Sequence, residues 1–516
     1  MKEENIMKKM QRNLLTTILL VSMIFSAIPV YVAQEKAVEV EAATTAIPIS
    51  NADELYNINN DLGGNYYLTK DIDMKSYGRW EPIEGFYGTL DGKGHAIKNL
   101  TTVTDKEYSG LFGIIGGDAT IKNLAMVNVC VTGSYAGGIA GKIESYDWSS
   151  ELYYGIGRDG IITIKNCYVS GQVTGNSYYR GGIVGGYECH SVSRFAGTVN
   201  ISNCYNESID CRGGIIGSEE YADSSASLTI ENCYNAADCY FGGITETLRG
   251  NARNCYSTGN IVNNPSYNLG GVAGEALQNA YLLNCYYLCD SKSKINTTIK
   301  GVGATNAPSG QSANALNKAA MKKKSSFKDW DFNNTWEMVT GVNDGMPVLR
   351  SLRKYFRVSK ATNDKSANKY YSKAFSVTLK AADGVTVYYT TDGTKPTKKS
   401  AVYSSPISIS KNTTLKYITA KSGYKSSAVT TKKYKIRTPE AKVSKKGGTY
   451  KKKVTVRLTA PKGTTIYYTT DGKTPTKKSK VYKGKLTLKK STTLKYIAVK
   501  EGWSSSAVAT EKYVIK

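Results

Sequence analysis

Alternating hydrophobic and polar residues mark the first two thirds of the chain. In residues 161–169, 199–205 and 228–234, Ile and Cys fall on one face, whereas Lys, Ser or Glu fall on the other. A period of two is typical of β-strands that bury one side. Each stretch contains the same tripeptide, Asn-Cys-Tyr, which occurs at 166–168, 203–205, 232–234, 254–256 and 284–286. The pattern therefore predicts a series of similar strands.

A second phrase, Gly-Gly followed by Ile or Val, mostly alternates with the first. The tripeptide cysteines are separated by 37, 29, 22 and 30 residues. Self-similarity at such a period indicates stacked units that bury their apolar faces against their neighbours. Glycine allows tight turning and close approach of backbones, so these segments are expected at a corner or second strand of each unit. The repeats predict a β-solenoid, in particular a parallel β-helix. The glycine pairs stand at 137–138, 181–182, 213–214, 242–243 and 270–271.

The glycine phrase also carries a family resemblance. Gly-Gly-Ile-Val-Gly at 181–185 resembles the GLUG repeat of bacterial surface proteins, and the likeness spans about residues 49–350. The resemblance implies an adhesin-like or protease-associated protein. The copy at 242–246 lacks its closing glycine, so one irregular coil is expected there. Similar opening motifs lie at 49–55, 67–74 and 86–95, and similar closing motifs at 327–332, Trp336 and 345–349.

The last third repeats itself at a constant offset of 79 residues. Tyr-Tyr-Thr-Thr-Asp-Gly at 388–393 returns at 467–472, and Asp-Gly after an alternating strand indicates a tight turn. These units resemble the chitobiase/β-hexosaminidase C-terminal domain, which implies an Ig-like, non-catalytic accessory module. The expected fold class is all-β: a parallel β-helix/β-solenoid followed by two small antiparallel Ig-like β-sandwiches. The expected domains are 1–43 (signal peptide), 44–352 (GLUG-type solenoid), and 353–437 and 438–516 (the two modules).

The N-terminus indicates export. Lys8, Lys9 and Arg12 precede an apolar run over 14–33, and small residues follow near Ala43. A retained membrane anchor is the alternative, because the run approaches the length that spans a bilayer of ~30 Å. With cleavage, we expect no membrane span and an extracellular protein, secreted or non-covalently associated with a cell wall.

Ten cysteines in an exported protein first suggest disulfides. Five of them, however, hold the same place in a repeat, and stacked coils set equivalent residues ~4.8 Å apart. Free cysteine behaves as a small buried hydrophobe, so we favour an inward ladder of thiols. Pairing stays open, because the same spacing lies within disulfide reach.

Charge divides the chain unequally. Residues 353–516 hold 39 Lys plus Arg and seven Asp plus Glu, a net charge of +32. Residues 1–352 hold 29 Lys plus Arg and 35 Asp plus Glu, a net charge of −6. Such an excess creates a long-range field that attracts anionic polymers. The expected partner is an anionic cell-wall polymer or glycan of a Gram-positive envelope, and a host or neighbouring-cell surface is a further candidate. Nucleic acid is not expected.

The sequence offers little for catalysis. His95 lies in a turn motif and His190 has no repeated partner, so neither predicts a nucleophile–base pair. Asp71 and Asp73 would share one strand face, yet both belong to the opening motif. We expect no catalytic residue, cofactor or metal, and a non-enzymatic adhesin-like protein with a solenoid binding face. The alternatives are a polysaccharide lyase or hydrolase with its groove on the β-helix, and a structural spacer.

Two aromatic residues are the candidate ligand contacts. Tyr424 and Trp503 are equivalent at the 79-residue offset, and each follows a glycine and precedes serines. A ring on a turn can stack on the C–H face of a sugar. The alternative, which we favour, is that each ring anchors a loop on its own sandwich.

Overall fold

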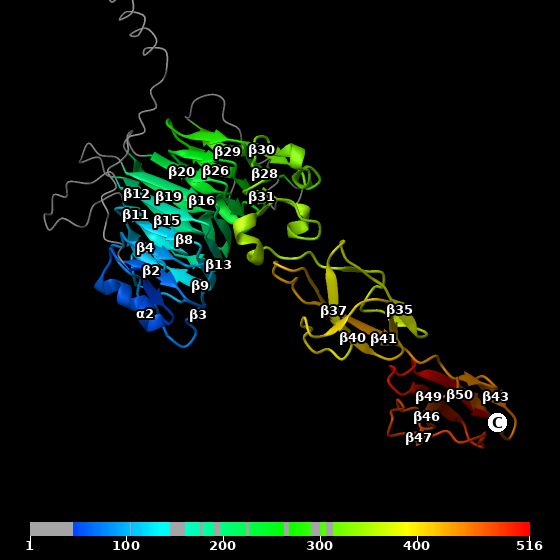
Figure 1. Cartoon of the computed structure of the whole chain (residues 1–516). Helices are drawn as coiled ribbons and strands as arrows, with labels where there is room; N and C mark the ends of the chain where they lie inside the picture. Colours follow the sequence, from blue (N-terminus) through cyan, green and yellow to red (C-terminus); the bar gives the residue numbers. More distant parts are fainter. Residues whose placement is uncertain are drawn as a thin grey trace, which may run out of the picture. The chain divides into compact units, whose positions relative to one another are not determined.

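The chain forms an all-β protein (Figure 1). The computed structural model describes residues 45–103, 105–144, 160–175, 179–189, 197–222, 227–262, 268–289, 300–305 and 313–516. The expected signal segment, 1–43, lies outside these residues. Ile47–Lys516 makes one compact unit.

Three long parallel sheets build the solenoid. Sheet I has the order β1 (Ile47–Ile49), β2 (Asn65–Leu68), β4 (Thr89–Asp91), β8 (Thr120–Lys122), β12 (Ile161–Lys165), β16 (Thr198–Ser202), β20 (Ser227–Glu231), β24 (Asn251–Arg253) and β27 (Tyr281–Leu283). Sheet II has the order β3 (Ile72–Asp73), β5 (Ala96–Lys98), β9 (Ala125–Thr132), β13 (Tyr168–Thr174), β17 (Tyr205–Ile209), β21 (Tyr234–Asn235), β25 (Tyr256–Ser257), β28 (Cys285–Leu288) and β30 (Ala313–Leu316).

Sheet III takes two short strands from each coil, one on either side of the Gly-Gly phrase. One row is β6 (Tyr108–Ser109), β10 (Tyr135–Gly137), β14 (Tyr179–Gly181), β18 (Cys211–Gly213) and β22 (Cys239–Gly242). The other is β7 (Phe112–Ile115), β11 (Ala140–Glu144), β15 (Val184–Cys189), β19 (Ile216–Ala222) and β23 (Thr245–Leu248). The rows meet at β26 (Gly270–Ala276), which also pairs with β29 (Lys300–Thr305). A Cβ on Gly137 would lie 2.2 Å from the Ala140 carbonyl oxygen, so the bend requires glycine.

The asparagine of each tripeptide forms the corner between sheets I and II. The expectation that simple alternation puts Ile and Cys on one face is wrong, because Ile164 and Cys167 are three residues apart and an unbroken strand would point them to opposite faces. Asn166 instead adopts the left-handed conformation, with φ of 55°, and both residues turn inward. The corner amides bond along the stack: Asn166 Nδ2 donates to Asn123 Oδ1 at 3.0 Å, and Asn203 Nδ2 donates to Asn166 Oδ1 at 3.2 Å.

The cysteines form the inward ladder that the repeat predicts. All five tripeptide cysteines are free thiols with no exposed surface, and they belong to the solenoid core. Burial raises the pKa of the Cys167, Cys233 and Cys285 thiols, which keeps them neutral. The five residues are Cys167, Cys204, Cys233, Cys255 and Cys285.

The tyrosines that follow the cysteines point to the opposite side of sheet II and stack on one another. The ring centroids of Tyr205 and Tyr234 lie 4.8 Å apart, and those of Tyr234 and Tyr256 lie 4.1 Å apart. Residues 320–358 cover this stack: Phe356 stacks on Tyr205 at 4.5 Å, and the Trp336 ring lies 5.7 Å from Tyr256. Most of the outer face of sheet II is therefore buried. The covering segment holds η2 (Ala320–Lys322), η3 (Lys324–Ser326), β31 (Trp336–Glu337), η4 (Asn343–Gly345), β32 (Val348–Leu349) and η5 (Arg350–Tyr355).

Each C-terminal module pairs one five-stranded sheet with two two-stranded sheets, mostly antiparallel. The first has β34 (Tyr370–Tyr371), β41 (Thr430–Ile436), β40 (Thr413–Ala420), β37 (Thr386–Thr390) and β38 (Ala401–Val402) in the larger sheet, with pairs β33 (Thr362–Asn363) to β36 (Leu379–Lys380) and β35 (Phe375–Val377) to β39 (Ile407–Ile409). The second has β43 (Gly448–Tyr450), β50 (Ala509–Ile515), β49 (Thr492–Lys500), β46 (Thr464–Thr469) and β47 (Lys480–Val481), with pairs β42 (Lys442–Val443) to β45 (Leu458–Thr459) and β44 (Val454–Val456) to β48 (Leu486–Leu488).

The only α-helix among the described residues is α2 (Ala52–Tyr56), which continues into η1 (Asn57–Asn60). Asn51 caps α2, because its side-chain oxygen accepts a hydrogen bond from the Glu54 N–H. In the described part of the chain, no helix is long and apolar enough to cross a membrane.

Candidate functional site

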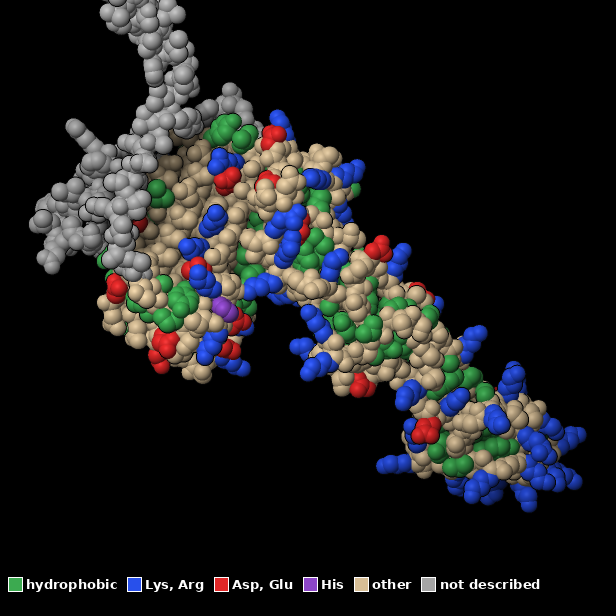
Figure 2. Space-filling view, in the orientation of Figure 1, with side chains coloured by type: hydrophobic (Ala, Val, Ile, Leu, Met, Phe, Trp, Pro, Cys, Tyr) green, Lys and Arg blue, Asp and Glu red, His purple; other side chains and the backbone are tan. Residues whose placement is uncertain are grey.

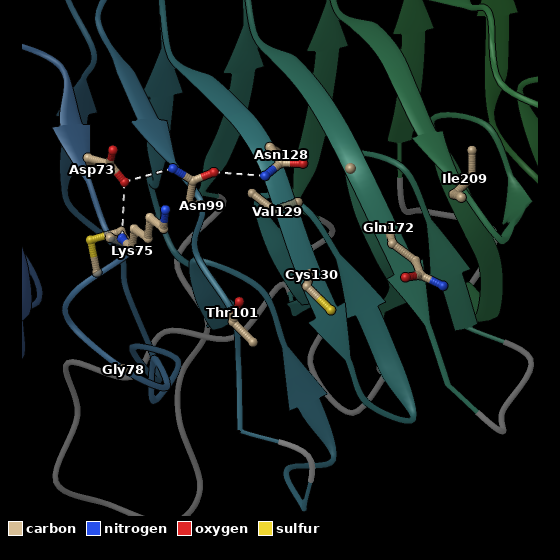
Figure 3. Close-up of a pocket in the computed structure, with 12 residues that line it drawn as sticks. Asp73, Lys75, Gly78, Asn99, Thr101, Asn128, Val129, Cys130, Gln172 and Ile209 are labelled. Atoms are coloured by element: carbon tan, nitrogen blue, oxygen red, sulfur yellow. Dashed lines mark hydrogen bonds between the residues drawn. The ribbon is translucent and has the colours of Figure 1, made fainter. Parts of the chain in front are cut away.

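An open groove of about 800 Å³ lies over the first strands of sheet II, beyond the tyrosine stack (Figure 3). A row of polar side chains runs along it from coil to coil. Asn99 Nδ2 donates to Asp73 Oδ1 at 2.7 Å, and Asn128 Nδ2 donates to Asn99 Oδ1 at 2.7 Å. Gln172 and the half-exposed Ile209 continue the lining on the next coils.

Mutual hydrogen bonds fix the orientation of these amides. Asn99 and Asn128 both adopt left-handed backbone conformations, with φ of 58° and 57°; Asn99 directly follows β5, and Asn128 lies at a register shift within β9. Lys75 and Thr101 add further donors to the groove. Polar groups at regular spacing beside a small apolar patch suit hydrogen bonding to a hydroxyl-rich ligand.

The outer face of sheet I carries a second polar row. Register pairs place Thr120 beside Thr163, Thr163 beside Asn200, and Asn200 beside Thr229. These outward side chains are partly exposed and repeat once per coil at the inter-strand spacing of ~4.8 Å. The row gives the solenoid a flat surface of hydroxyls and amides.

Sheet III brings together the charged cluster that sequence analysis did not find. The Lys142 ammonium lies 2.7 Å from Glu144 Oε1, contacts Glu188, and stands 5.2 Å and 5.3 Å from the ring centroids of Tyr108 and Tyr135. The lysine is 5% exposed, and the two carboxylates raise its pKa, so it stays charged. Lys142 therefore remains an ammonium group near neutral pH. Register places Glu144 beside Glu188 on the next coil, and the only signal in the sequence is that both lie seven residues after the first glycine of the Gly-Gly phrase.

The missing glycine at 246 does not interrupt the sheet. β23 still pairs with both β19 and β26, and Glu246 accepts hydrogen bonds from Arg212 on the preceding coil. The guanidinium also lies 3.8 Å from the Phe241 ring centroid. A register shift between Cys211 and Gly213 lies before the glycine phrase rather than at position 246, and comparable shifts occur in other coils.

Asp71, Asp73 and His95 have partners within the solenoid. Asp71 lies 2.6 Å from Lys98 Nζ and 3.4 Å from His95 Nδ1. Asp73 accepts a hydrogen bond from the Asn99 side-chain amide. Asp71 and Asp73 are both exposed, as alternation predicts. Hydrogen bonds lower the pKa of Asp73, so its carboxylate is ionised at neutral pH. No group of three or more His, Cys, Asp and Glu in the described ranges could hold a metal ion.

Tyr424 lies on the turn between β40 and β41, but its side chain is not free. Its hydroxyl donates to Glu337 Oε1 at 2.7 Å, and its ring packs against the cluster around Trp336. Burial, followed by the nearby Glu337 carboxylate, raises the pKa of Tyr424 to about 12. We expected packing on its own sandwich; the ring instead contacts the segment that covers the tyrosine stack.

Trp503 repeats this arrangement one module later. Its indole N–H donates to the Ser410 carbonyl at 2.8 Å, and its ring packs against the core of the first module. The residue that follows each ring also bonds to the preceding unit. The Lys425 N–H donates to the Phe356 carbonyl at 3.0 Å, and the Ser504 N–H donates to the Ile436 carbonyl at 2.8 Å. Both rings are thus positioned at junctions with the preceding unit. Sugar contact by either ring stays a prediction.

Comparison with known proteins supports the fold of the last third. Residues 366–431 and 445–510 each match the family model of the chitobiase/beta-hexosaminidase C-terminal domain. The two modules are therefore similar to that domain. In the hexosaminidases this is a C-terminal accessory domain, not the catalytic one.

Two curated relatives each match a part of the chain. A "Putative Gly-rich membrane protein" of Evansella cellulosilytica is 32% identical over 112 residues, 19% of this chain and 13% of that protein. "Halomucin" of Haloquadratum walsbyi is 34% identical over 137 residues, 24% of this chain and 1% of that protein. The chain therefore spans only a small part of the length of either relative.

Proposed function

We propose that this is a non-enzymatic, adhesin-like protein of the cell surface or exterior. Its basic C-terminal modules attach it to anionic cell-wall polymer or glycan, while the solenoid presents a binding face. The segregation of charge carries the proposal: a net charge of +32 over residues 353–516, against −6 over the remainder. Lysine and arginine side chains crowd the surface of the last module (Figure 2).

Further features support a surface role. The groove at Asp73, Asn99 and Asn128 and the polar row of sheet I are two solenoid surfaces that the covering segment leaves accessible. The GLUG resemblance and the names of the two relatives also suit an extracellular protein, secreted or held to the wall without a covalent bond.

Binding to isolated Gram-positive cell walls tests the attachment. The protein should sediment with walls that carry anionic polymers, and about 0.5 M NaCl should release most of it, because the Debye length then falls to ~4 Å. Binding that survives removal of the anionic polymers, or that ignores salt, would contradict the proposal. A glycan array would identify the ligand of the solenoid.

The alternative function is a polysaccharide lyase or hydrolase. One observation favours it: Lys142, Glu144 and Glu188 lie together beside Tyr108 and Tyr135 on the outer side of the β-helix. Turnover assays on a panel of polysaccharides would decide. If the wild-type protein cleaves a polysaccharide and Lys142→Met loses this activity with an unchanged circular dichroism spectrum, the enzymatic function is supported and the adhesin proposal is wrong.

A further inference from the structure

The two modules present the same outward face on their five-stranded sheets. In β40, Leu415 and Tyr417 belong to the module core, so the positions between them point away from it. Lys416 on β40 and Lys433 on β41 therefore project outward, and Lys433 is exposed. Their equivalents in the second module are Lys495 on β49 and Lys512 on β50, at the same offset of 79 residues.

Cross-strand register surrounds these lysines with hydroxyl groups. Lys416 pairs with Thr390 on one side and Thr431 on the other, and Lys433 pairs with Thr414. Equivalently, Lys495 pairs with Thr469 and Thr510, and Lys512 pairs with Thr493. Each module thus carries two lysines on adjacent strands, diagonal to each other at ~7 Å between Cβ atoms.

An aromatic ring adjoins each lysine pair. Tyr388 pairs with Val402 and with Ile418, and Tyr467 pairs with Val481 and with Ile497. Val402 is 54% exposed and Val481 is 44% exposed, so both valines are unusually accessible for their type. The face combines ammonium groups, hydroxyls and a small apolar patch.

One carboxylate adjoins each face, because Asp392 is bridged to Thr414 and Asp471 to Thr493, so the lysines outnumber it two to one. The structure describes all of residues 353–516, whose seven acidic residues occupy turns, linkers or the core side of a strand. Glu511 pairs with Leu494 on the core side, and Asp392 and Asp471 lie in the turns after β37 and β46. The acidic residues are Asp364, Asp383, Asp392, Glu440, Asp471, Glu501 and Glu511.

We propose that these two sheet faces are the binding sites for a linear wall polymer with repeating phosphate groups. The inference rests on the proposed attachment function and assigns its site. A phosphate has several acceptor oxygens, so one group can accept from a lysine and its threonine neighbours together. The Tyr388 and Tyr467 rings can pack against the carbon segments between phosphates. Two equal faces on one chain allow bivalent binding, which strengthens attachment without new contacts.

Purified lipid-free poly(glycerol phosphate) is the probe, and calorimetry of the full chain at about 0.15 M NaCl gives its Kd. The face variant combines Lys416→Gln, Lys433→Gln, Lys495→Gln and Lys512→Gln. The matched control removes the same charge from exposed turns through the four changes Lys398→Gln, Lys399→Gln, Lys477→Gln and Lys478→Gln. We expect the Kd to rise at least 30-fold for the face variant and to change less than 3-fold for the control.

A second variant leaves the charge unchanged. Thr414→Val with Thr493→Val removes one hydroxyl from each face and should weaken binding 3- to 10-fold, with an unchanged melting temperature. Equal losses in the face variant and the turn control, or no loss in the threonine variant, would overturn the assigned site while leaving electrostatic attachment intact. A wild-type protein that binds neither the polymer nor polymer-bearing walls would instead refute the proposed function. Stronger binding to vesicles of anionic lipid than to the polymer would also overturn the site.

Discussion

The solenoid and the C-terminal modules both repeat their sequence, but the repeats meet in different ways. In the solenoid, equivalent residues stack directly: Tyr205, Tyr234 and Tyr256 touch one another, and the tripeptide cysteines form one buried ladder. In the modules, equivalent residues such as Tyr417 and Tyr496 lie in separate cores. Repetition therefore builds a continuous interior in the first region and duplicates a surface in the second.

The difference sets how far a mutation acts. A stacked repeat contacts the coils before and after it, so a defect in one coil is transmitted to its neighbours. A module has its own core, so a defect should stay within it. Mutations at equivalent positions can test this contrast directly.

The largest effect is expected at the centre of the cysteine ladder. Cys204→Asp places a carboxylate without a partner among fully buried residues and should abolish folding of the solenoid, whereas Cys204→Ala should cost about 1–2 kcal/mol. Denaturant unfolding followed by circular dichroism measures both. Cys289→Asp, at an exposed position, is the control. A folded Cys204→Asp protein of normal stability would contradict the inward ladder.

The tyrosine stack comes next. Tyr234 is 1% exposed and its ring lies between those of Tyr205 and Tyr256, so Tyr234→Ala should lower the free energy of unfolding by about 3–5 kcal/mol. Tyr281→Ala, at a position 45% exposed, should change it by less than about 0.5 kcal/mol. Equal effects in a thermal melt would mean that the covering segment does not bury the stack.

A smaller, pH-dependent effect is expected at Glu219 on sheet III. Burial raises the pKa of this carboxyl from its ordinary value of 4.5 to about 8, although the Arg249 N–H donates to it at 2.7 Å. The folded state thus binds more protons, so the stability from this group is complete below pH 4.5 and is lost as pH rises toward 8. Glu219→Gln should remove about 2–4 kcal/mol of this decline between pH 5 and pH 8. An unchanged pH slope relative to wild type, with Glu275→Gln as control, would disprove the buried acid.

The smallest effect is expected at the junction between the modules. Trp503→Ala removes the hydrogen bond to Ser410 and a partly buried ring, and should cost about 1–2 kcal/mol. Trp503→Phe keeps an aromatic ring and should recover about half of the loss. Scanning calorimetry should show the shift only in the module transition. A shift of the solenoid transition would contradict the local action of module defects.

The sequence predicts the repeated parts of the fold but little of the parts that occur only once. The period of the Asn-Cys-Tyr phrase predicts parallel stacking and inward cysteines, because equivalent residues of a solenoid must lie above one another. The cover over Tyr205 and Tyr234 could not be predicted, since Phe356 and Trp336 are more than 100 residues away and carry no matching pattern. The groove was missed for a similar reason, because Asn99 and Asn128 belong to coils that lack the tripeptide.

The central claim is that equivalent residues are stacked and inaccessible in the solenoid but separately exposed in the modules. Native-state labelling of the whole protein with thiol and amine reagents, followed by peptide mass spectrometry, tests both halves in one measurement. The account predicts protection of the tripeptide cysteines, free reaction of Cys289, and matching labelling of Lys433 and Lys512. Ready labelling of most tripeptide thiols, or protection of only one of the two lysines, would contradict it.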